Sequence, residues 1–162
     1  MVAEAANNQI TLSETKSESM RDLIHSLDDA SIVRILRFFS SGDTRGIETE
    51  LSEELRHALQ EEFAIILLPT PPSDAELARA ALLVLAENPR MSERIKTIAG
   101  TAWHGMSGVD SAGIVVAALV VLQTRVRIER VQNGRWKFLI EKTAIGNPQF
   151  KALLEKLISY LP

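Results

Sequence analysis

The chain has 162 residues, of which 46% are apolar and 24% charged, and it contains no cysteine. This composition is typical of a soluble globular protein and excludes a disordered chain, while the missing cysteines exclude disulfides, zinc–thiolate sites and cysteine nucleophiles. The net charge of −3 is unevenly divided, because residues 1–66 carry 13 acidic and 6 basic side chains whereas residues 67–162 carry 8 and 12. Such asymmetry is typical either of a partner-binding surface or of a solvated acidic helical face.

Residues 1–19 have no basic region followed by an apolar run, so we expect no secretory signal. The longest apolar stretch, residues 112–122, is shorter than the about 20 residues that a membrane-spanning helix needs, so we expect no membrane span. A chain without cysteine fits a reducing compartment, and we expect a cytoplasmic location.

Residues 1–16 are polar and aperiodic, which predicts a flexible tail. The next segment, residues 17–68, is an acidic N-terminal part in which three apolar stripes recur at helical spacing. We expect Asp28 or Asp29 to cap the second helix, and the third helix to run from about Thr44 into the sixties. The stripes are Met20, Leu23, Ile24 and Leu27; Ile32, Ile35, Leu36 and Phe39; and Ile47, Leu51, Leu55, Leu59 and Phe63.

A proline-rich connector, residues 69–72, separates this part from residues 73–162. Just before the connector, residues 63–68 are continuously apolar, and their pattern leaves open whether they form helix or strand. Just after it, Ser73 and Glu76 have the spacing of a capping box. Asn88-Pro89 can end that helix and cap the next one, which should end before Gly100.

Residues 112–122 could also be either helix or strand, because their β-branched residues favour a strand while their length and Ala-Ala-Leu centre favour a helix. We predict a helix that is buried on nearly all sides. Asn147-Pro148 predicts the start of the last helix. The apolar face of this helix consists of Phe150, Leu153, Leu154, Leu157, Ile158 and Leu161.

Residues 124–142 (TRVRIERVQNGRWKFLIEK) have the alternation of an antiparallel β-hairpin. A two-residue turn at Asn133-Gly134 would mix charged and apolar side chains on one face. A three-residue turn at 132–134, a type I turn followed by a glycine bulge, separates them, and we predict this register. It pairs Val126 with Ile140, Ile128 with Phe138 and Arg130 with Trp136 on one face, and Arg125 with Glu141, Arg127 with Leu139 and Glu129 with Lys137 on the other.

An isolated hairpin is only marginally stable in water, so its apolar face must be covered, and the C-terminal helix is the nearest element that can do so. The predicted fold is therefore α+β and predominantly helical: amphipathic helices with one antiparallel β-hairpin at about 124–142, packed by a C-terminal helix. At this level the plan is similar to small helical modules with a terminal hairpin among bacterial adaptor and effector-associated domains, an analogy of fold that assigns no residue a role.

One loop holds side chains that could bind a ligand or take part in acid–base chemistry. Trp103, His104 and Asp110 lie in or beside the glycine-rich stretch that precedes the buried helix, and the loop Trp103–Gly108 also contains a serine. A histidine and an aspartate near a helix N-terminus can transfer protons or hold an anion. The alternative is an ordinary loop with a partly packed tryptophan. The sequence shows no set of catalytic residues, no metal-ligand pattern and no cofactor motif.

The charged face of the hairpin is the other candidate surface, and Arg125, Arg127 and Lys137 are its candidate partner-binding residues. A basic hairpin with aromatic residues can bind nucleic acid, but a chain with a pI near 5.7 lacks the strong positive field that backbone binding needs, so nucleic acid is an unlikely partner. The alternative is a solvated charged strand.

The sequence thus predicts a non-enzymatic protein–protein interaction module, which is an adaptor, a regulator or an assembly subunit. Its partner would be another protein or a second copy of the chain. One alternative is a small-ligand-binding or enzymatic domain that uses the Trp103–Gly108 loop. A second alternative is a nucleic-acid accessory protein that uses the basic hairpin.

Overall fold

The computed structural model describes residues 18–40, 42, 45–101 and 111–160. The fold is α+β and predominantly helical, as predicted, with one two-stranded antiparallel sheet in the described part of the chain. A helix over residues 18–26 comes first. It is followed by α2 (Asp29–Ser40), α3 (Glu53–Glu62), α4 (Asp74–Leu85), α5 (Pro89–Ala99), α6 (Ser111–Leu122), β1 (Val126–Arg130), β2 (Trp136–Ile140), the 3-10 turn η1 (Lys142–Ala144) and α7 (Pro148–Tyr160).

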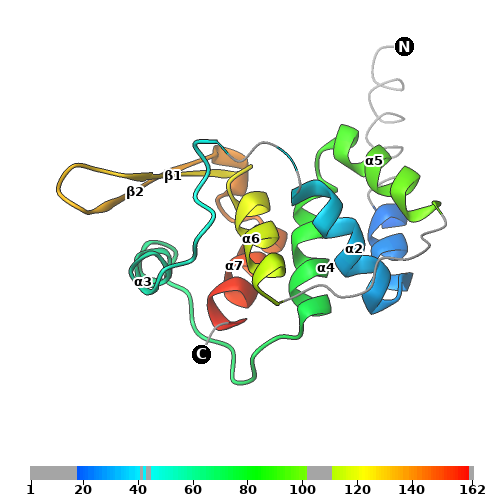
Figure 1. Ribbon diagram of the computed structural model, residues 1–162, viewed down its shortest axis with the longest axis horizontal. Helices are drawn as coiled ribbons and strands as arrows, with labels where there is room; N and C mark the ends of the chain where they lie inside the picture. Colours follow the sequence, from blue (N-terminus) through cyan, green and yellow to red (C-terminus); the bar gives the residue numbers. More distant parts are fainter. Residues whose placement is uncertain (1–17, 41, 43–44, 102–110, 161–162) are drawn as a thin grey trace, which may run out of the picture.

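Helix α4 is the centre of the helical body, where it packs against α2, α6 and α7 (Figure 1). Its Leu77 and Leu82 are fully buried. Helix α6 confirms the prediction of a buried helix over residues 112–122, because Ala118 and Leu119 have no exposed surface and only a few of its side chains reach solvent. Apolar residues from every helix join one continuous core.

Local capping residues set most helix starts, as the sequence predicts. Asp28 accepts a hydrogen bond from the backbone N–H of Ser31 at the start of α2. Ser73 and Glu76 form a complete capping box, in which the Ser73 Oγ accepts from the Glu76 N–H and the Glu76 carboxylate accepts from the Ser73 N–H. Asn88 caps α5, with proline in the first helical position.

The predicted start of the third helix at about Thr44 is wrong. Residues 48–52 have no regular secondary structure, and α3 begins only at Glu53, because the Ser52 Oγ caps it by accepting from the Leu55 N–H at 3.2 Å. The Gln123 side chain holds this segment at both Glu48 backbone groups, with N···O distances of 2.9 and 2.6 Å. Leu51 is buried all the same, so its place in an apolar stripe reflects tertiary packing.

Residues 63–68 form neither the helix nor the strand that their apolar character suggested. Ala64 takes a left-handed conformation (φ 51°), and the Ile65 N–H bonds back to the Gln60 carbonyl at 3.0 Å, which ends α3. The chain then runs as irregular coil with Ile65 buried and Ile66 84% exposed.

The helices on the two sides of the 69–72 connector share the same core. Helix α2 packs directly on α4 and α6, and Arg79 of α4 joins the two parts by an ion pair with Asp29 at 2.9 Å. The division of the chain at the connector therefore remains a prediction. The segments before and after the connector each supply helices to the shared core. Within the described residues, none of the helices is both long and apolar enough to cross a membrane.

Candidate functional site

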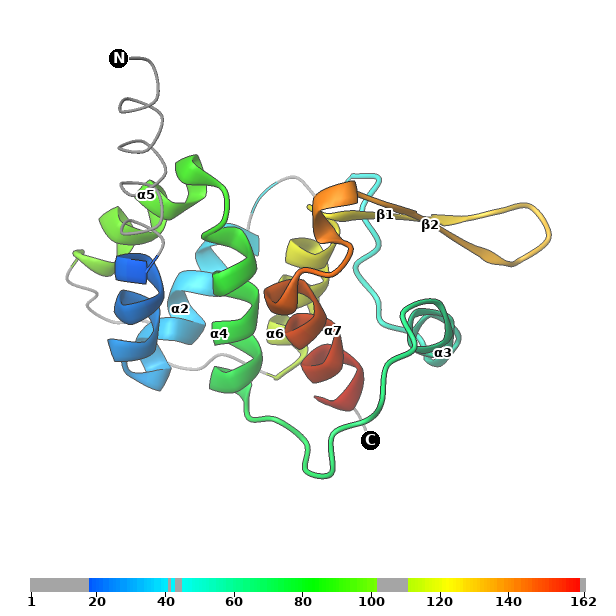
Figure 2. The same ribbon diagram turned by 180° about the vertical axis from the view of Figure 1, so that it is seen from behind.

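The β-hairpin is the part of the molecule that stands out from the helical body. Figures 1 and 2 show β1 and β2 projecting to one side, with the turn between them far from the helix bundle and α3 on the same side. Only the base of the hairpin adjoins α6 and η1, which precede and follow it in the chain. One face of its distal half lies toward α3, where Arg130 pairs with Glu54 at 3.4 Å, and the opposite face is exposed.

The predicted hairpin register is confirmed at every pair. Val126 lies opposite Ile140, Ile128 opposite Phe138 and Arg130 opposite Trp136. The turn is the predicted three-residue one, since the Gly134 N–H bonds to the Val131 carbonyl at 2.9 Å and Gly134 has φ +80°. Only glycine takes that conformation without steric cost, so the Asn-Gly dipeptide fixed the turn.

The inner face of the hairpin reaches the core through aromatic side chains. Val126 and Ile128 are buried, and the Phe63 ring lies between Phe138, at 6.3 Å, and Phe150 of α7, at 5.6 Å between ring centroids. The C-terminal helix was expected to cover the apolar face of the hairpin, and Phe63, just after α3, also takes part in covering it. At the distal end the Arg130 guanidinium lies 5.5 Å from the Trp136 ring centroid, which confirms the predicted stack.

The outer face carries Arg127, Lys137 and Leu139, all exposed. Arg127 forms an ion pair with Glu129 of the same strand at 2.6 Å. Lys137 lies opposite Glu129 but forms no ion pair within the described chain. Leu139 is 46% exposed between these charges. The register predicted from the sequence placed Leu139 on this face but did not include it among the candidate partner-binding residues. An apolar residue at an outward-facing strand position was the signal that could have indicated it.

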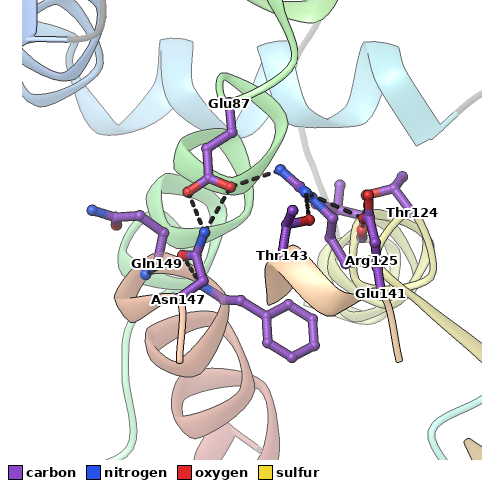
Figure 3. Close-up of polar contacts among 9 residues, drawn as sticks. Glu87, Thr124, Arg125, Glu141, Thr143, Asn147 and Gln149 are labelled. Atoms are coloured by element: carbon purple, nitrogen blue, oxygen red, sulfur yellow. Dashed lines mark hydrogen bonds and ion pairs between the residues drawn. The ribbon is translucent and has the colours of Figure 1, made fainter. Parts of the chain in front are cut away.

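Arg125, the third candidate partner-binding residue, is held at the base of the hairpin by other elements (Figure 3). Its guanidinium contacts Glu87 after α4 at 2.7 Å and Glu141 at 3.2 Å, and its side chain is only 17% exposed. The Asn147 side-chain amide donates to the same Glu87 carboxylate at 2.9 and 3.0 Å. Asn147 also caps α7 through its Oδ1, so this cluster joins α4, the hairpin and α7.

Two hollows adjoin the hairpin. One, of about 380 Å³, lies beside the Arg125 cluster and is lined by residues of the α4–α5 turn together with Thr124 and Glu141. The other, of about 520 Å³, lies between α3 and the hairpin and is lined by Ala58, Glu61, Glu62, Arg135, Trp136 and Phe138. The indole Nε1 of Trp136 is buried and has no hydrogen-bond partner in the described chain, which is an unusual state for a buried donor.

The other candidate site falls outside the described residues: Trp103, His104 and Asp110 all lie between 102 and 110. Of the remaining histidines, His25 and His57 are exposed helix residues, as predicted. Across residues 18–101 and 111–160, apart from the undescribed positions near 41–44, no three His, Asp or Glu side chains come together in an arrangement that could hold a metal ion.

Comparisons with known proteins found no match to this chain among protein-family models, curated proteins or solved structures.

Proposed function

We propose that this protein is a non-enzymatic protein–protein interaction module, an adaptor, regulator or assembly subunit, that binds its partner through the outer face of the hairpin. The observation that supports this proposal is the projection of a two-stranded hairpin beyond the helical body with Arg127, Lys137 and Leu139 on its exposed side. The absence of cysteine suits a reducing compartment such as the cytoplasm.

The construction of the hairpin favours an interaction surface over a purely structural element. Two-stranded hairpins are marginal on their own, and this one is anchored along its inner face, through Val126, Ile128 and the Phe63–Phe138 contact, and by the ion pair of Arg125 with Glu87 at its base. The side chains of the outer face, Arg127, Lys137 and Leu139, are exposed and add nothing to the buried core. Exposed apolar area beside cations is the composition found in protein contact surfaces, where an apolar centre is bordered by polar groups.

Electrostatics favour an acidic partner surface, because Lys137 forms no ion pair within the described chain and Arg127, although paired with Glu129 at 2.6 Å, is exposed beside it. Exposed charges of this kind act mainly on the rate of association, because they steer the encounter before the contact forms. Their effect is screened over about 8 Å at physiological salt. The contact should therefore weaken as salt rises.

Reversing both charges tests the proposal. The double variant Arg127→Glu/Lys137→Glu should keep the thermal midpoint nearly unchanged, because both side chains are exposed, but should associate more slowly with its partner or lose self-association. Sedimentation velocity, together with binding kinetics against a partner isolated with the wild-type chain, measures this at low and high salt.

A matched control changes the net charge by the same amount elsewhere. Arg90 of α5 and Lys151 of α7 are exposed, and Arg90→Glu/Lys151→Glu should behave as the wild type does. If the hairpin variant associates as fast and as tightly as the control at both salt concentrations, the outer face is a solvated strand and the proposal is wrong.

A further inference from the structure

We propose that the outer edge of β2 pairs with the same edge of a second copy of this chain, in an antiparallel arrangement whose two-fold axis passes beside Leu139. This inference rests on the proposed function and names the partner. It joins two hairpins into a four-stranded sheet in which the tips point in opposite directions.

Along its outer edge, the backbone of β2 has groups that no residue of the described chain binds. The Glu141 N–H bonds to the Arg125 carbonyl and the Val131 N–H to the Arg135 carbonyl, both at 2.9 Å, so the odd-numbered residues form the bonded pairs of the hairpin. In an antiparallel ladder the residues between such pairs turn their N–H and C=O groups away from the partner strand. Phe138 and Ile140 therefore direct their backbone groups outward, where another strand can bind them.

Side-chain charge selects the register of this pairing. A two-fold axis beside Lys137 would place the two Lys137 ammonium groups against each other, and like charges directly opposite destabilise a strand pair. An axis beside Phe138 would place each Lys137 against Leu139. An axis beside Leu139 places each Lys137 opposite the partner copy's Glu141. Two Lys137–Glu141 ion pairs then form on one face of the sheet.

The same register also buries apolar surface. The two Leu139 side chains, each 46% exposed in one copy, face each other on the axis, and each Phe138 faces an Ile140 on the inner face. Glu141 is available for this contact because its side chain is 51% exposed and Arg125 keeps its shorter contact to Glu87. The two Leu139 residues, one from each copy, also form a non-hydrogen-bonded pair, the type of antiparallel pair in which side chains approach most closely.

The β1 edge has less to gain from the same kind of pairing. Arg127 and Glu129 could pair across a two-fold axis beside Ile128, but they already neutralise each other within one strand at 2.6 Å. Val126 and Ile128 are already buried against the body. Only on β2 does pairing supply a partner for an unpaired cation and cover an exposed leucine.

Site-specific disulfide formation tests this register, because the wild-type chain contains no cysteine. Leu139→Cys in the full-length chain should form a disulfide-linked dimer under mild oxidation, since directly opposite residues of this pair type lie about 4.5 Å apart between Cα atoms, within the range of a disulfide. Arg127→Cys, on the same face but on β1, should remain a monomer. Efficient linkage through Lys137→Cys in place of Leu139→Cys would overturn the proposed register.

A charge swap provides a second readout without oxidation. Lys137→Glu places two carboxylates together at each end of the contact and should raise the dimer dissociation constant about tenfold in sedimentation equilibrium. Lys137→Glu/Glu141→Lys reverses both charges and should restore the dimer. Equal dissociation constants for the wild type and Lys137→Glu would contradict the assigned contact.

The two proposals fail in different ways. If the wild-type chain is monomeric at all concentrations and Leu139→Cys does not link, Lys137 protects the edge from pairing, as edge lysines commonly do, and the self-association inference is wrong. The proposed function would still stand if Arg127→Glu/Lys137→Glu slowed binding to a different protein. If that variant also bound as the wild type does, both proposals would be wrong.

Discussion

Ala64 is the residue whose backbone conformation conflicts most clearly with its side chain. Its φ of 51° lies in the left-handed region, and among described non-glycine residues it alone has a positive φ. The conformation is imposed because the Ile65 N–H bonds to Gln60 and the Ala64 N–H to Glu61, which ends α3 and directs the chain toward the connector. A Cβ atom in this region meets the following carbonyl oxygen.

Replacing Ala64 with glycine should therefore stabilise the protein. The steric cost of the left-handed conformation is about 1–2 kcal/mol, and the greater freedom of glycine in the unfolded chain offsets part of it, so we expect a net gain of about 0.5–1 kcal/mol. Urea denaturation at constant m-value measures the change. Ala86→Gly, at a C-cap residue with right-handed φ and ψ, is the control and should destabilise. A loss of stability in Ala64→Gly would mean that Ala64 is not strained.

Two carboxylates carry pKa values lowered by helix capping. Hydrogen bonds from the Ser73 backbone N–H lower the pKa of Glu76 below its ordinary value of 4.5, and bonds from the Ser31 hydroxyl and N–H lower the pKa of Asp28 below 3.8. A carboxyl whose pKa is lower in the folded than in the unfolded state stabilises the fold while it is ionised. This contribution is complete above the unfolded pKa and is lost as the pH falls through the folded one.

Glu76→Gln isolates this effect. Glutamine can still accept the N-cap hydrogen bond but does not titrate. Wild type should be the more stable protein near neutral pH, and its advantage should shrink once the pH falls below about 4.5, where Glu76 begins to protonate. Denaturant midpoints between pH 3 and 7 measure the difference, with Glu50→Gln, a carboxylate outside any cap, as the control. Parallel curves for Glu76→Gln and wild type would contradict the expectation.

At the scale of elements, α7 closes the core by packing on α4 and α6. Its buried face contains Phe150, Leu153, Leu154, Leu157 and Ile158, as its apolar pattern predicts, while the last residue of the predicted face, Leu161, lies outside the described residues. At its last turn the Tyr160 hydroxyl donates to Asp74 at the start of α4, and the Ser159 Oγ accepts from the Leu68 N–H at 2.9 Å. The helix thus also fixes the chain that enters the connector.

Leu157→Ala should cost about 2–5 kcal/mol, because Leu157 is fully buried and the loss of its side chain leaves a cavity. Chemical denaturation of the full-length chain measures it. Lys151→Ala, on the exposed side of the same helix, should change stability by less than about 0.5 kcal/mol. A cost below about half a kcal/mol for Leu157→Ala would show that this face is not packed as described.

Elements specified by local sequence were predicted most accurately. The hairpin register follows from the separation of apolar and charged side chains and from one glycine, and the capping box at Ser73 follows from a three-residue spacing. The start of α3 was misplaced because apolar residues at helical spacing continue back to Ile47. There the Ser52 cap and the distant contact to Gln123 outweigh the periodicity.

The candidate site was predictable only in part, because some of its contacts join residues that are distant in the sequence. Alternation along the strands places Arg127 and Lys137 on the outer face, where the structure has them. Arg125 contacts Glu141 as the register predicts, but nothing in the local sequence indicates that it would also contact Glu87, which lies 38 positions away. The unpartnered indole of Trp136 likewise depends on how α3 lies beside the hairpin, which no local pattern encodes.

At the scale of the whole molecule, the uneven charge of the two halves is partly used within the fold. Arg79 contacts Asp29, and Arg130 contacts Glu54 at 3.4 Å, so basic residues after the connector meet acidic residues before it. These surface pairs contribute little to stability individually. The larger contribution comes from apolar packing across the same boundary.

Helix α2 supplies that packing, because its Ile32, Ile35 and Leu36 lie in the core against α4 and α6. Burial of each such side chain is worth about 1.5–3 kcal/mol, so the three together approach the net stability of a whole domain, about 5–15 kcal/mol. A fragment of residues 73–162 would expose the surfaces of α4 and α6 that α2 covers. Neither side of the connector should therefore fold cooperatively by itself.

Expressing the halves separately tests this dependence. Residues 73–162 alone should show broad, non-cooperative unfolding and should bind a dye specific for exposed apolar surface, because the α2-binding faces of α4 and α6 are open. Mixing in residues 17–72 should restore a single cooperative transition, and the same mixture with Ile35→Asp in the shorter fragment should not, since Ile35 is buried. If residues 73–162 alone unfolded cooperatively near the midpoint of the intact chain, the connector would separate two independent domains, and the shared core would be an interface between them.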